Sequence, residues 1–175
     1  IVKMVAALSG LLKNMAKGFN EKVTLQEELK FLEDYITIEK MRYMEMFDVE
    51  TQVEKEELYE AKIIKLTLQP LVENAIFSGI EPGGKNGNIR IHIWQEENRL
   101  CVSVRDDGVG MTEEKIREIM ENPQKRKGDT MSGIGLPNVD QRIKLVYGES
   151  YGIHIRSRVG EYTEILVTLP IEYGK

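Results

Sequence analysis

Apolar residues recur at two different periods along the chain. Over residues 1–16, and again over 24–46, they return every three or four positions, which is the spacing of an amphipathic helix. The first stripe needs a partner helix to cover it. The second helix opens on "TLQE", a capping box in which Thr24 and Glu27 each bond the other's backbone N–H. The chain therefore begins with two helical segments.

The remainder of the chain mixes strands with helices. Strand patterns occur in "KIIKLTL", in "NIRIHIWQ" and "RLCVSVRD", which form a hairpin around "EEN", and in "YGIHIRSR" and "YTEILVTLP". Helices are predicted over "LVENAIFSGI", "TEEKIREIM" and "LPNVDQRIKLVYG", with Pro70 and Pro137 in first turns and Gly148 after the last helix. This order predicts an α+β fold, with helices on one face of a mixed, mostly antiparallel sheet and helical segments before it.

Composition narrows the possible functions. The 175 residues suffice for one full domain with a smaller appendage, and the net charge of −5 argues against nucleic acid as a partner. Cys101 is the single cysteine, so no internal disulfide can form, which suits a reducing cytoplasmic setting. No run approaches the roughly 18 apolar residues of a membrane span. Because the sequence begins with Ile1 in mid-pattern, we expect a fragment of a longer protein.

"GIEPGGKN" imitates a phosphate-binding P-loop. Gly79, Gly84 and Lys85 have the required spacing, but Asn86 stands where Ser or Thr would bind magnesium. A working P-loop also lies between a strand and a following helix, whereas here a helix precedes and a strand follows. We interpret the segment as an ordinary glycine-rich connection.

Three other motifs carry a stronger nucleotide signal. In "LVENAI", Asn74 lies within a helix, where asparagine is mildly unfavourable, so it should have another use. "DDGVGM" places Asp106 at the end of a strand before Gly108 and Gly110, and "GIGLPN" repeats the glycine spacing before a helix. Singly, each has a structural alternative: Asn74 could bond within its helix, Asp106 could cap a turn and the glycines could form tight connections. Together, and in this order, they predict a nucleotide site.

These motifs resemble the N box and the two glycine boxes of the ATP-binding domain of sensor histidine kinases, a fold shared with gyrase, Hsp90 and mismatch-repair ATPases. "LQPLVENA", the residues Asn138 and Arg142, and the upstream "TLQEELKFLEDYITIEKMRY" are most similar to the LytS/YesM-like branch. The resemblance covers nearly the whole chain and implies a two-layer α/β sandwich of the Bergerat type. It implies that 1–46 are a remnant of the dimerisation and phosphotransfer region with its connector, and that 47–175 form the ATP-binding catalytic domain.

The resemblance also implies a role for each motif. Asp106 would accept a hydrogen bond from the exocyclic amine of adenine, where guanine presents a carbonyl oxygen, so ATP is preferred over GTP. Asn74 would offer a neutral oxygen to Mg²⁺ and is the catalytic candidate. The implied ATP-binding residues are Asn74, Asp106, Gly108, Gly110, Met111, Gly133, Ile134, Gly135, Leu136 and Thr163.

The polar segment between the last two motifs is expected to be a lid hinged at Gly133 and Gly135. Lys125, Arg126 and Lys127 are candidate lid contacts, with a solvated basic cluster as the alternative. The resemblance further implies a response regulator as partner, a homodimer in the full-length protein and a membrane anchor outside this cytoplasmic fragment.

Several positions depart from the family pattern. Phe77 and Ser78 stand where a basic residue and a ring or histidine are usual, and Tyr162 replaces a common glycine before Thr163. Pro70 occupies the position of the water-activating glutamate of gyrase-like members, which argues against a dedicated ATP hydrolase.

The phosphoacceptor is also missing. His92 and His154 are both predicted in strands, whereas the substrate histidine of the family lies on an upstream helix. Two alternatives to a kinase fragment therefore stay open: a degenerate nucleotide-binding or docking module, and an anti-sigma-type protein-serine kinase of the same fold. The upstream helical segment disfavours the serine kinase.

Overall fold

The computed structural model describes residues 21–121 and 135–174. Its elements, in chain order, are β1 (Lys22–Thr24), α2 (Leu25–Arg42), β2 (Phe47–Val53), η1 (Glu56–Glu60), β3 (Lys62–Ile64), α3 (Gln69–Asn74), η2 (Ala75–Ile80), η3 (Glu81–Gly83), β4 (Gly87–Glu96), β5 (Arg99–Asp106), α4 (Glu113–Glu121), α5 (Gly135–Tyr147), β6 (Gly152–Arg158) and β7 (Tyr162–Pro170). The helix predicted over 1–16 and the candidate lid lie outside the described residues, as do Lys125, Arg126 and Lys127.

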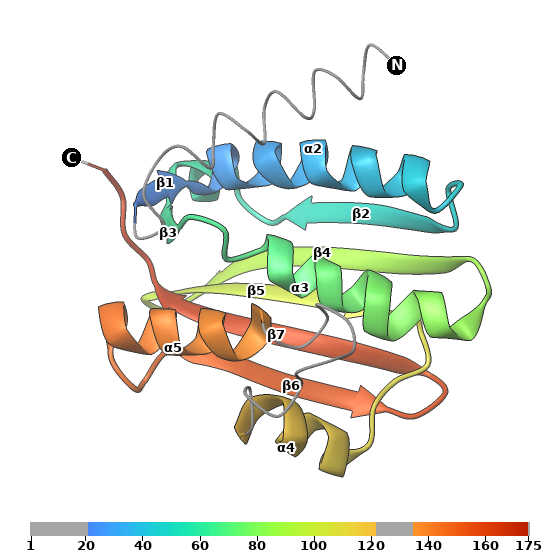
Figure 1. The fold of residues 1–175 in the computed structure, drawn as a ribbon. Helices are drawn as coiled ribbons and strands as arrows, with labels where there is room; N and C mark the ends of the chain where they lie inside the picture. Colours follow the sequence, from blue (N-terminus) through green and yellow to red (C-terminus); the bar gives the residue numbers. More distant parts are fainter. Residues whose placement is uncertain (1–20, 122–134, 175) are drawn as a thin grey trace.

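A five-stranded sheet forms the centre of the fold, in the order β2-β4-β5-β7-β6 (Figure 1). Only the β2–β4 pair is parallel among these strands, and the other three pairs are antiparallel. The helices α3 and α5 lie in front of the sheet in Figure 1, side by side. The predicted α+β fold with a mixed, mostly antiparallel sheet is confirmed.

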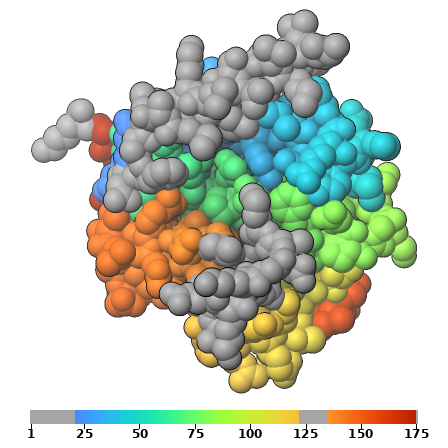
Figure 2. Space-filling view, in the orientation of Figure 1, coloured from blue at the N-terminus to red at the C-terminus, as the bar shows by residue number. Residues whose placement is uncertain are grey.

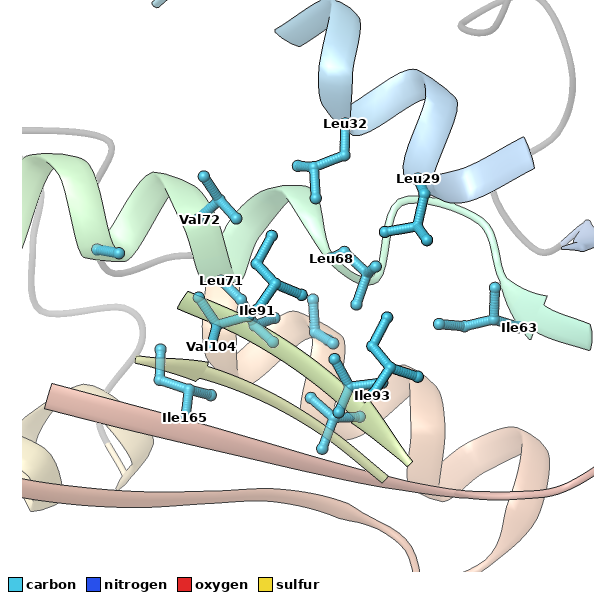
Figure 3. Close-up of a cluster of buried hydrophobic side chains, with 14 of the residues drawn as sticks. Leu29, Leu32, Ile63, Leu68, Leu71, Val72, Ile91, Ile93, Val104 and Ile165 are labelled. Atoms are coloured by element: carbon cyan, nitrogen blue, oxygen red, sulfur yellow. The ribbon is translucent and has the colours of Figure 1, made fainter. Parts of the chain in front are cut away.

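The core lies between these helices and the sheet. Along β4, Ile89, Ile91 and Ile93 are buried while the residues between them are more exposed, which is the period of a strand with one covered face. Figure 3 shows Leu29 and Leu32 of α2 extending this cluster beyond the sheet. The helix α2 is thus packed onto the sheet domain through its predicted apolar stripe.

The N-terminus of α2 has the predicted capping box. The Glu27 N–H donates to Thr24 Oγ1 at 3.1 Å, and the Thr24 N–H donates to Glu27 Oε2 at 2.8 Å. The helix ends at Arg42, four residues before the predicted end. Met44 and Glu45 have φ angles of 49° and 58°, so the chain leaves the helix through two left-handed residues.

Three further features differ from the sequence interpretation. The strand β2 was not predicted because it is an edge strand whose side chains are mostly exposed and polar. The strand expected over 62–68 ends at Ile64, and Leu66 is left-handed with φ 58°. The helix after Pro70 continues as π-helix through η2. The hairpin β4–β5, the helices α4 and α5, and the final strands agree with the prediction.

Helices α2, α3 and α5 are visible on one face of the molecule in Figure 2. On the face drawn in Figure 2, α2 (blue to cyan) lies along one edge and α5 (orange) along another, with residues of α3 and η2 (green) between them. Helix α3 therefore occupies the middle of the helical layer and contacts α5 directly.

We expect the Thr24→Ala substitution to lower the free energy of unfolding by about 1 kcal/mol, because it removes the acceptor of the Glu27 N–H at the start of α2. Chemical denaturation followed by circular dichroism measures the change. Thr37→Ala, on the same helix, is the control and should change stability by less than about 0.5 kcal/mol. Equal effects of the two substitutions would contradict a role for the capping box.

Candidate functional site

The first candidate, Asp106, is the last residue of β5 and is buried, with 2% of its surface exposed. The pKa of its carboxyl group is raised to about 7, mainly by burial and also by the nearby Asp107 carboxylate, while hydrogen bonds from the Gly108 and Thr163 backbone oppose the rise. The Gly108 N–H donates to Asp106 Oδ1 at 3.0 Å. Asp106 thus caps the turn, as the structural alternative proposed, while remaining a buried carboxyl group with an altered proton affinity.

The wall beside Asp106 is formed by Gly79 of η2. A Cβ atom on Gly79 would lie 2.6 Å from the carboxyl carbon of Asp106, and one on Gly108 would lie 2.6 Å from the Cα of Gly79. The Gly79 carbonyl accepts a hydrogen bond from the Val109 N–H at 2.9 Å. Only glycine permits this close approach of η2 and residues 106–109. Gly79 belongs to the P-loop-like segment, so that segment contributes to the site by close packing.

The end of the first glycine motif packs against the hairpin β6–β7. Gly110 has a φ of 67°, and a Cβ atom there would lie 2.9 Å from the Cα of Val159. The Met111 N–H donates to Ser157 Oγ at 2.7 Å. Ser157 Oγ also lies 3.0 Å from Thr163 Oγ1, and Thr163 is the register partner of Asp106. The structure therefore places Met111 and Thr163 in one group with Asp106.

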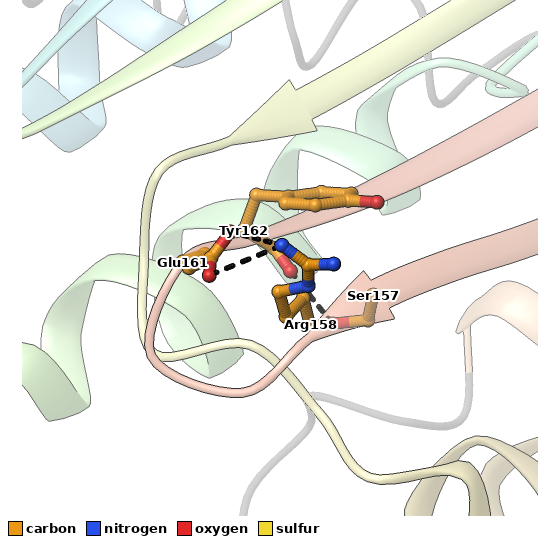
Figure 4. A network of polar contacts seen from close by, with 4 residues as sticks. All are labelled: Ser157, Arg158, Glu161 and Tyr162. Atoms are coloured by element: carbon orange, nitrogen blue, oxygen red, sulfur yellow. Dashed lines mark hydrogen bonds and ion pairs between the residues drawn. The ribbon is translucent and has the colours of Figure 1, made fainter.

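Ser157 was not recognised in the sequence. Its hydroxyl bonds the Tyr162 carbonyl oxygen at 2.7 Å, and in Figure 4 it lies beneath Tyr162 while Arg158 reaches Glu161. Its signal in the sequence is weak, because a serine in an alternating strand is unremarkable. The contact with Met111 spans 46 residues and no local pattern indicates it.

Asn74 closes α3 and is 3% exposed. Its Oδ1 and Nδ2 atoms are both buried, and neither has a hydrogen-bond partner among the described residues. The alternative in which Asn74 bonds within its own helix therefore fails. A buried amide without a partner is costly, which makes it a candidate ligand for a bound group.

The second glycine motif begins α5. Gly135 packs on the start of α3, where a Cβ atom would lie 2.9 Å from the Cβ of Pro70. Leu136 is buried and Asn138 is exposed. Gly133 and Ile134 lie outside the described residues.

The candidate residues thus fall into two groups. One contains Asp106 and its neighbours, and the other contains Asn74 with Pro70 and Gly135. A single helical rod, formed by α3 and η2 (69–80), joins them. Asn74 precedes Gly79 by five residues, which is roughly 7 Å along a helix axis. Local π-helix is common at functional sites, and here it begins directly after Asn74.

Phe77 and the two histidines, which depart from the family pattern, all have ordinary structural surroundings. The Phe77 ring packs edge-on against Tyr43 at 5.9 Å between centroids, and the Arg42 guanidinium lies 5.9 Å from the Phe77 ring centroid. His92 lies in β4 beside Glu54, with 3.0 Å between His92 Nε2 and Glu54 Oε1. His154 is exposed in β6. Both histidines are strand residues, as predicted.

Within residues 21–121 and 135–174, no group of three histidine, cysteine or acidic side chains is arranged to hold a metal ion. No helix in the same part of the chain is long and apolar enough to cross a membrane.

Comparison with known proteins agrees with this geometry. The family described as histidine kinase-, DNA gyrase B- and HSP90-like ATPase matches residues 60–173, and a histidine kinase family matches residues 1–47. The chain is 37% identical to the sensor histidine kinase YesM of Bacillus subtilis over 97% of its length, and 37% identical to the sensor histidine kinase YpdA of Escherichia coli over 86%. It spans only 28% and 25% of these two relatives.

The solved catalytic domain of the histidine kinase ThkA has the same fold. It superposes with a TM-score of 0.62 at 24% identity, covering 86% of this chain and 94% of that domain. The family match extends over most of the chain and includes all three nucleotide motifs. The chain therefore belongs to the histidine kinase-, DNA gyrase B- and HSP90-like ATPase family.

Proposed function

We propose that this chain is the catalytic ATP-binding part of a sensor histidine kinase, which transfers the γ-phosphate of ATP to a histidine on a helix upstream of residue 1. The observation that carries the proposal is Asn74, buried and without a hydrogen-bond partner among the described residues. It lies on the same rod as Gly79, which packs against the buried carboxyl group of Asp106. The Asn74 amide lies within the rod and the Asp106 carboxyl group lies against its Gly79 end. Two polar groups placed in this way suit the phosphate end and the base end of one nucleotide.

Asp106 is proposed to recognise adenine. Its ionised carboxylate accepts a hydrogen bond from the exocyclic amine, and it repels the carbonyl oxygen that guanine presents at that position. With a pKa raised to about 7, the carboxyl group is partly protonated in the free protein at neutral pH. A bound amine donor favours the ionised form and so lowers this pKa in the complex.

Asn74 fits a magnesium ligand, because its oxygen is buried, neutral and unpaired among the described residues. When bound with ATP, Mg²⁺ neutralises charge on the phosphate oxygens. Holding the phosphates in place and excluding water is the protein's contribution, since this transfer depends chiefly on positioning. The remaining proposed contacts are those of the two glycine motifs and the hairpin: Gly108, Gly110, Met111, Gly133, Ile134, Gly135, Leu136 and Thr163.

The proposal includes the division of the chain. Residues 1–46 are the remnant of the dimerisation region with its connector, and 47–175 are the catalytic domain. The full-length protein is a membrane-anchored homodimer whose cytoplasmic portion contains this chain, and a response regulator receives the phosphate.

A degenerate nucleotide-binding or docking module is the second candidate. Phe77 favours it, because this ring packs against Tyr43 at a position where the family usually has a basic residue. With phenylalanine at this position, the site has one fewer positively charged side chain near the phosphates than is usual in the family.

The chain should bind ATP in preference to GTP, and only weakly without Mg²⁺. Asp106→Asn should weaken ATP binding by about 1.5 to 3 kcal/mol, because a charged acceptor is lost. Isothermal titration calorimetry measures both affinities. Asp107→Asn is the control: Asp107 is exposed and bonded to Asn88, and removing its charge favours ionised Asp106, so this variant should not weaken ATP binding. An unchanged affinity in Asp106→Asn would remove the adenine assignment.

The difference in ATP affinity between the wild type and Asp106→Asn should also depend on pH. Asp106 is ionised above its pKa of about 7 and neutral below it, so lowering the pH from 8 to 6 removes the charged acceptor from the wild type. The affinity ratio of wild type to Asp106→Asn should therefore shrink as the pH falls. Protonation of ATP itself affects both proteins and cancels in the ratio.

Gly79→Ala should lower stability by about 1 to 3 kcal/mol through overpacking and weaken ATP binding at the same time. The added methyl group would lie 2.6 Å from the Asp106 carboxyl carbon, so the carboxyl group has to move. Gly83→Ala, whose Cβ atom meets Val109 Cγ1 at 3.4 Å, should leave both quantities nearly unchanged. Thermal unfolding and calorimetry on the two variants test this, and an ATP affinity retained by Gly79→Ala would place the base elsewhere.

The chain as given should not phosphorylate itself. His92 and His154 are held in strands and have no means of reaching a γ-phosphate bound near Asn74. Incubation with radiolabelled ATP should give no acid-labile, base-stable phosphate, and restoring the upstream helix with its histidine should allow labelling. Label on either strand histidine would show a misplaced acceptor. No label with the helix restored would favour the degenerate module.

A further inference from the structure

A buried carboxylate in α2 has no part in the proposed chemistry. Glu28 is 2% exposed and accepts three consecutive backbone N–H groups: Leu66 at 3.0 Å, Thr67 at 2.8 Å and Leu68 at 2.9 Å. Burial raises the pKa of Glu28, and these donors oppose the rise by stabilising the charged form. Glu28 therefore fixes a segment almost forty residues away in the sequence.

The same segment is also held by α5. Arg142 Nη2 donates to the Leu66 carbonyl oxygen at 2.9 Å. Leu66 has a φ of 58°, a left-handed conformation that a leucine rarely adopts. The Leu66 N–H thus donates to the Glu28 carboxylate, and the Leu66 C=O accepts from the Arg142 guanidinium. These two bonds keep Leu66 in the left-handed conformation. We call Glu28, Arg142 and residues 66–68 the 66–68 clamp.

The clamp lies immediately before the rod that carries Asn74. Leu68 is the N-cap residue of α3, and its carbonyl oxygen accepts from the Leu71 and Val72 N–H groups at 3.1 and 3.2 Å. Pro70, in the first turn of α3, packs on Gly135 of the second glycine motif. The start of the rod is therefore set jointly by α2 and α5.

We infer that Glu28 and Arg142 are positioning residues of the nucleotide site: the 66–68 clamp sets the position of the Asn74 side chain and thereby the affinity for Mg²⁺-ATP. The inference rests on the proposed function, because it assigns the clamp to the magnesium ligand of that site. Asn74 has no hydrogen bond of its own among the described residues, so its position depends on how the rod is held.

This role differs measurably from plain stabilisation. The Asp106 end of the rod is fixed separately, by the packing of Gly79 against Gly108. A loosened clamp should therefore disturb the magnesium end more than the adenine end. The readout is the ratio of ATP affinity with Mg²⁺ to ATP affinity in EDTA, which a general loss of stability does not change.

The test is calorimetric titration of ATP into the 175-residue chain, with Mg²⁺ and with EDTA, at a temperature where circular dichroism shows each variant folded. Glu28→Gln keeps the shape of the side chain but turns an NH₂ group toward backbone N–H donors. It should weaken Mg²⁺-ATP binding about tenfold and binding in EDTA less than about twofold. Glu33→Gln, exposed on the same helix, is the matched control and should match the wild type.

Leu66→Gly in the Glu28→Gln background gives a second readout. Glycine adopts a φ of 58° readily, so the segment needs less support from the clamp. This change should restore part of the lost Mg²⁺ advantage. Arg142→Gln, which releases the other side of Leu66, should reproduce the effect of Glu28→Gln, and it replaces that variant if Glu28→Gln does not fold.

The outcomes separate the two proposals. A wild type that binds no ATP in either buffer overturns the proposed function, and the clamp's role with it. A wild type that binds ATP while the clamp variants keep its Mg²⁺ advantage, or lose affinity equally in both buffers, overturns the clamp alone.

Discussion

The helical rod of residues 69–80 is held by close packing at one end and by hydrogen bonds to a buried carboxylate at the other. At one end, Gly79 packs so closely on Asp106 and Gly108 that no Cβ atom fits. At the other, three N–H groups before the rod bond the buried Glu28 carboxylate. The rod lies beside α5 on the same face of the sheet. It contacts the first glycine motif through Gly79 and Gly108, and the second through Pro70 and Gly135. The arrangement of the site follows from how this rod is packed.

Much of the fold could be predicted because its information is local. The capping box of α2, the turn prolines and the alternation in β4 each depend on residues within a few positions of one another. The strand β2 does alternate, since Phe47 is buried and Val49 and Val53 pack against the core while the polar residues between them are exposed. It was missed because it is a short edge strand whose side chains are mostly exposed. The early end of α2 was equally hidden, because Met44 and Glu45 are not residues that usually indicate a left-handed turn.

The candidate site divides in the same way. Asn74 and Asp106 could be singled out because an asparagine inside a helix and an aspartate before a G-x-G turn are locally unusual. Ser157 and Glu28 could not, since each is an ordinary residue of its element. The contacts that involve them in the site are made with Met111, 46 residues away, and with a segment that begins 38 residues away. Gly79 was noticed for the wrong reason. Its spacing to Gly84 and Lys85 imitates a phosphate loop, whereas its actual use is the approach to Asp106 that only glycine allows.

The free protein keeps polar groups in the site in an unfavourable state. A buried amide without a hydrogen-bond partner costs about 1 to 3 kcal/mol, and the Asn74 amide has none within residues 21–121 and 135–174. Asp106 is held with a pKa of about 7, against 3.8 for an ordinary aspartate, so its ionised form is also destabilised by burial. A ligand that donates a hydrogen bond to Asp106 and whose Mg²⁺ binds the Asn74 oxygen removes part of both unfavourable free energies. This gain strengthens binding. A pocket whose polar groups were satisfied internally would be more stable alone and would bind less tightly. The same reasoning explains why the contacts around the rod are so close: Asn74, which has no hydrogen-bond partner among the described residues, keeps its position only if the backbone that carries it cannot relax.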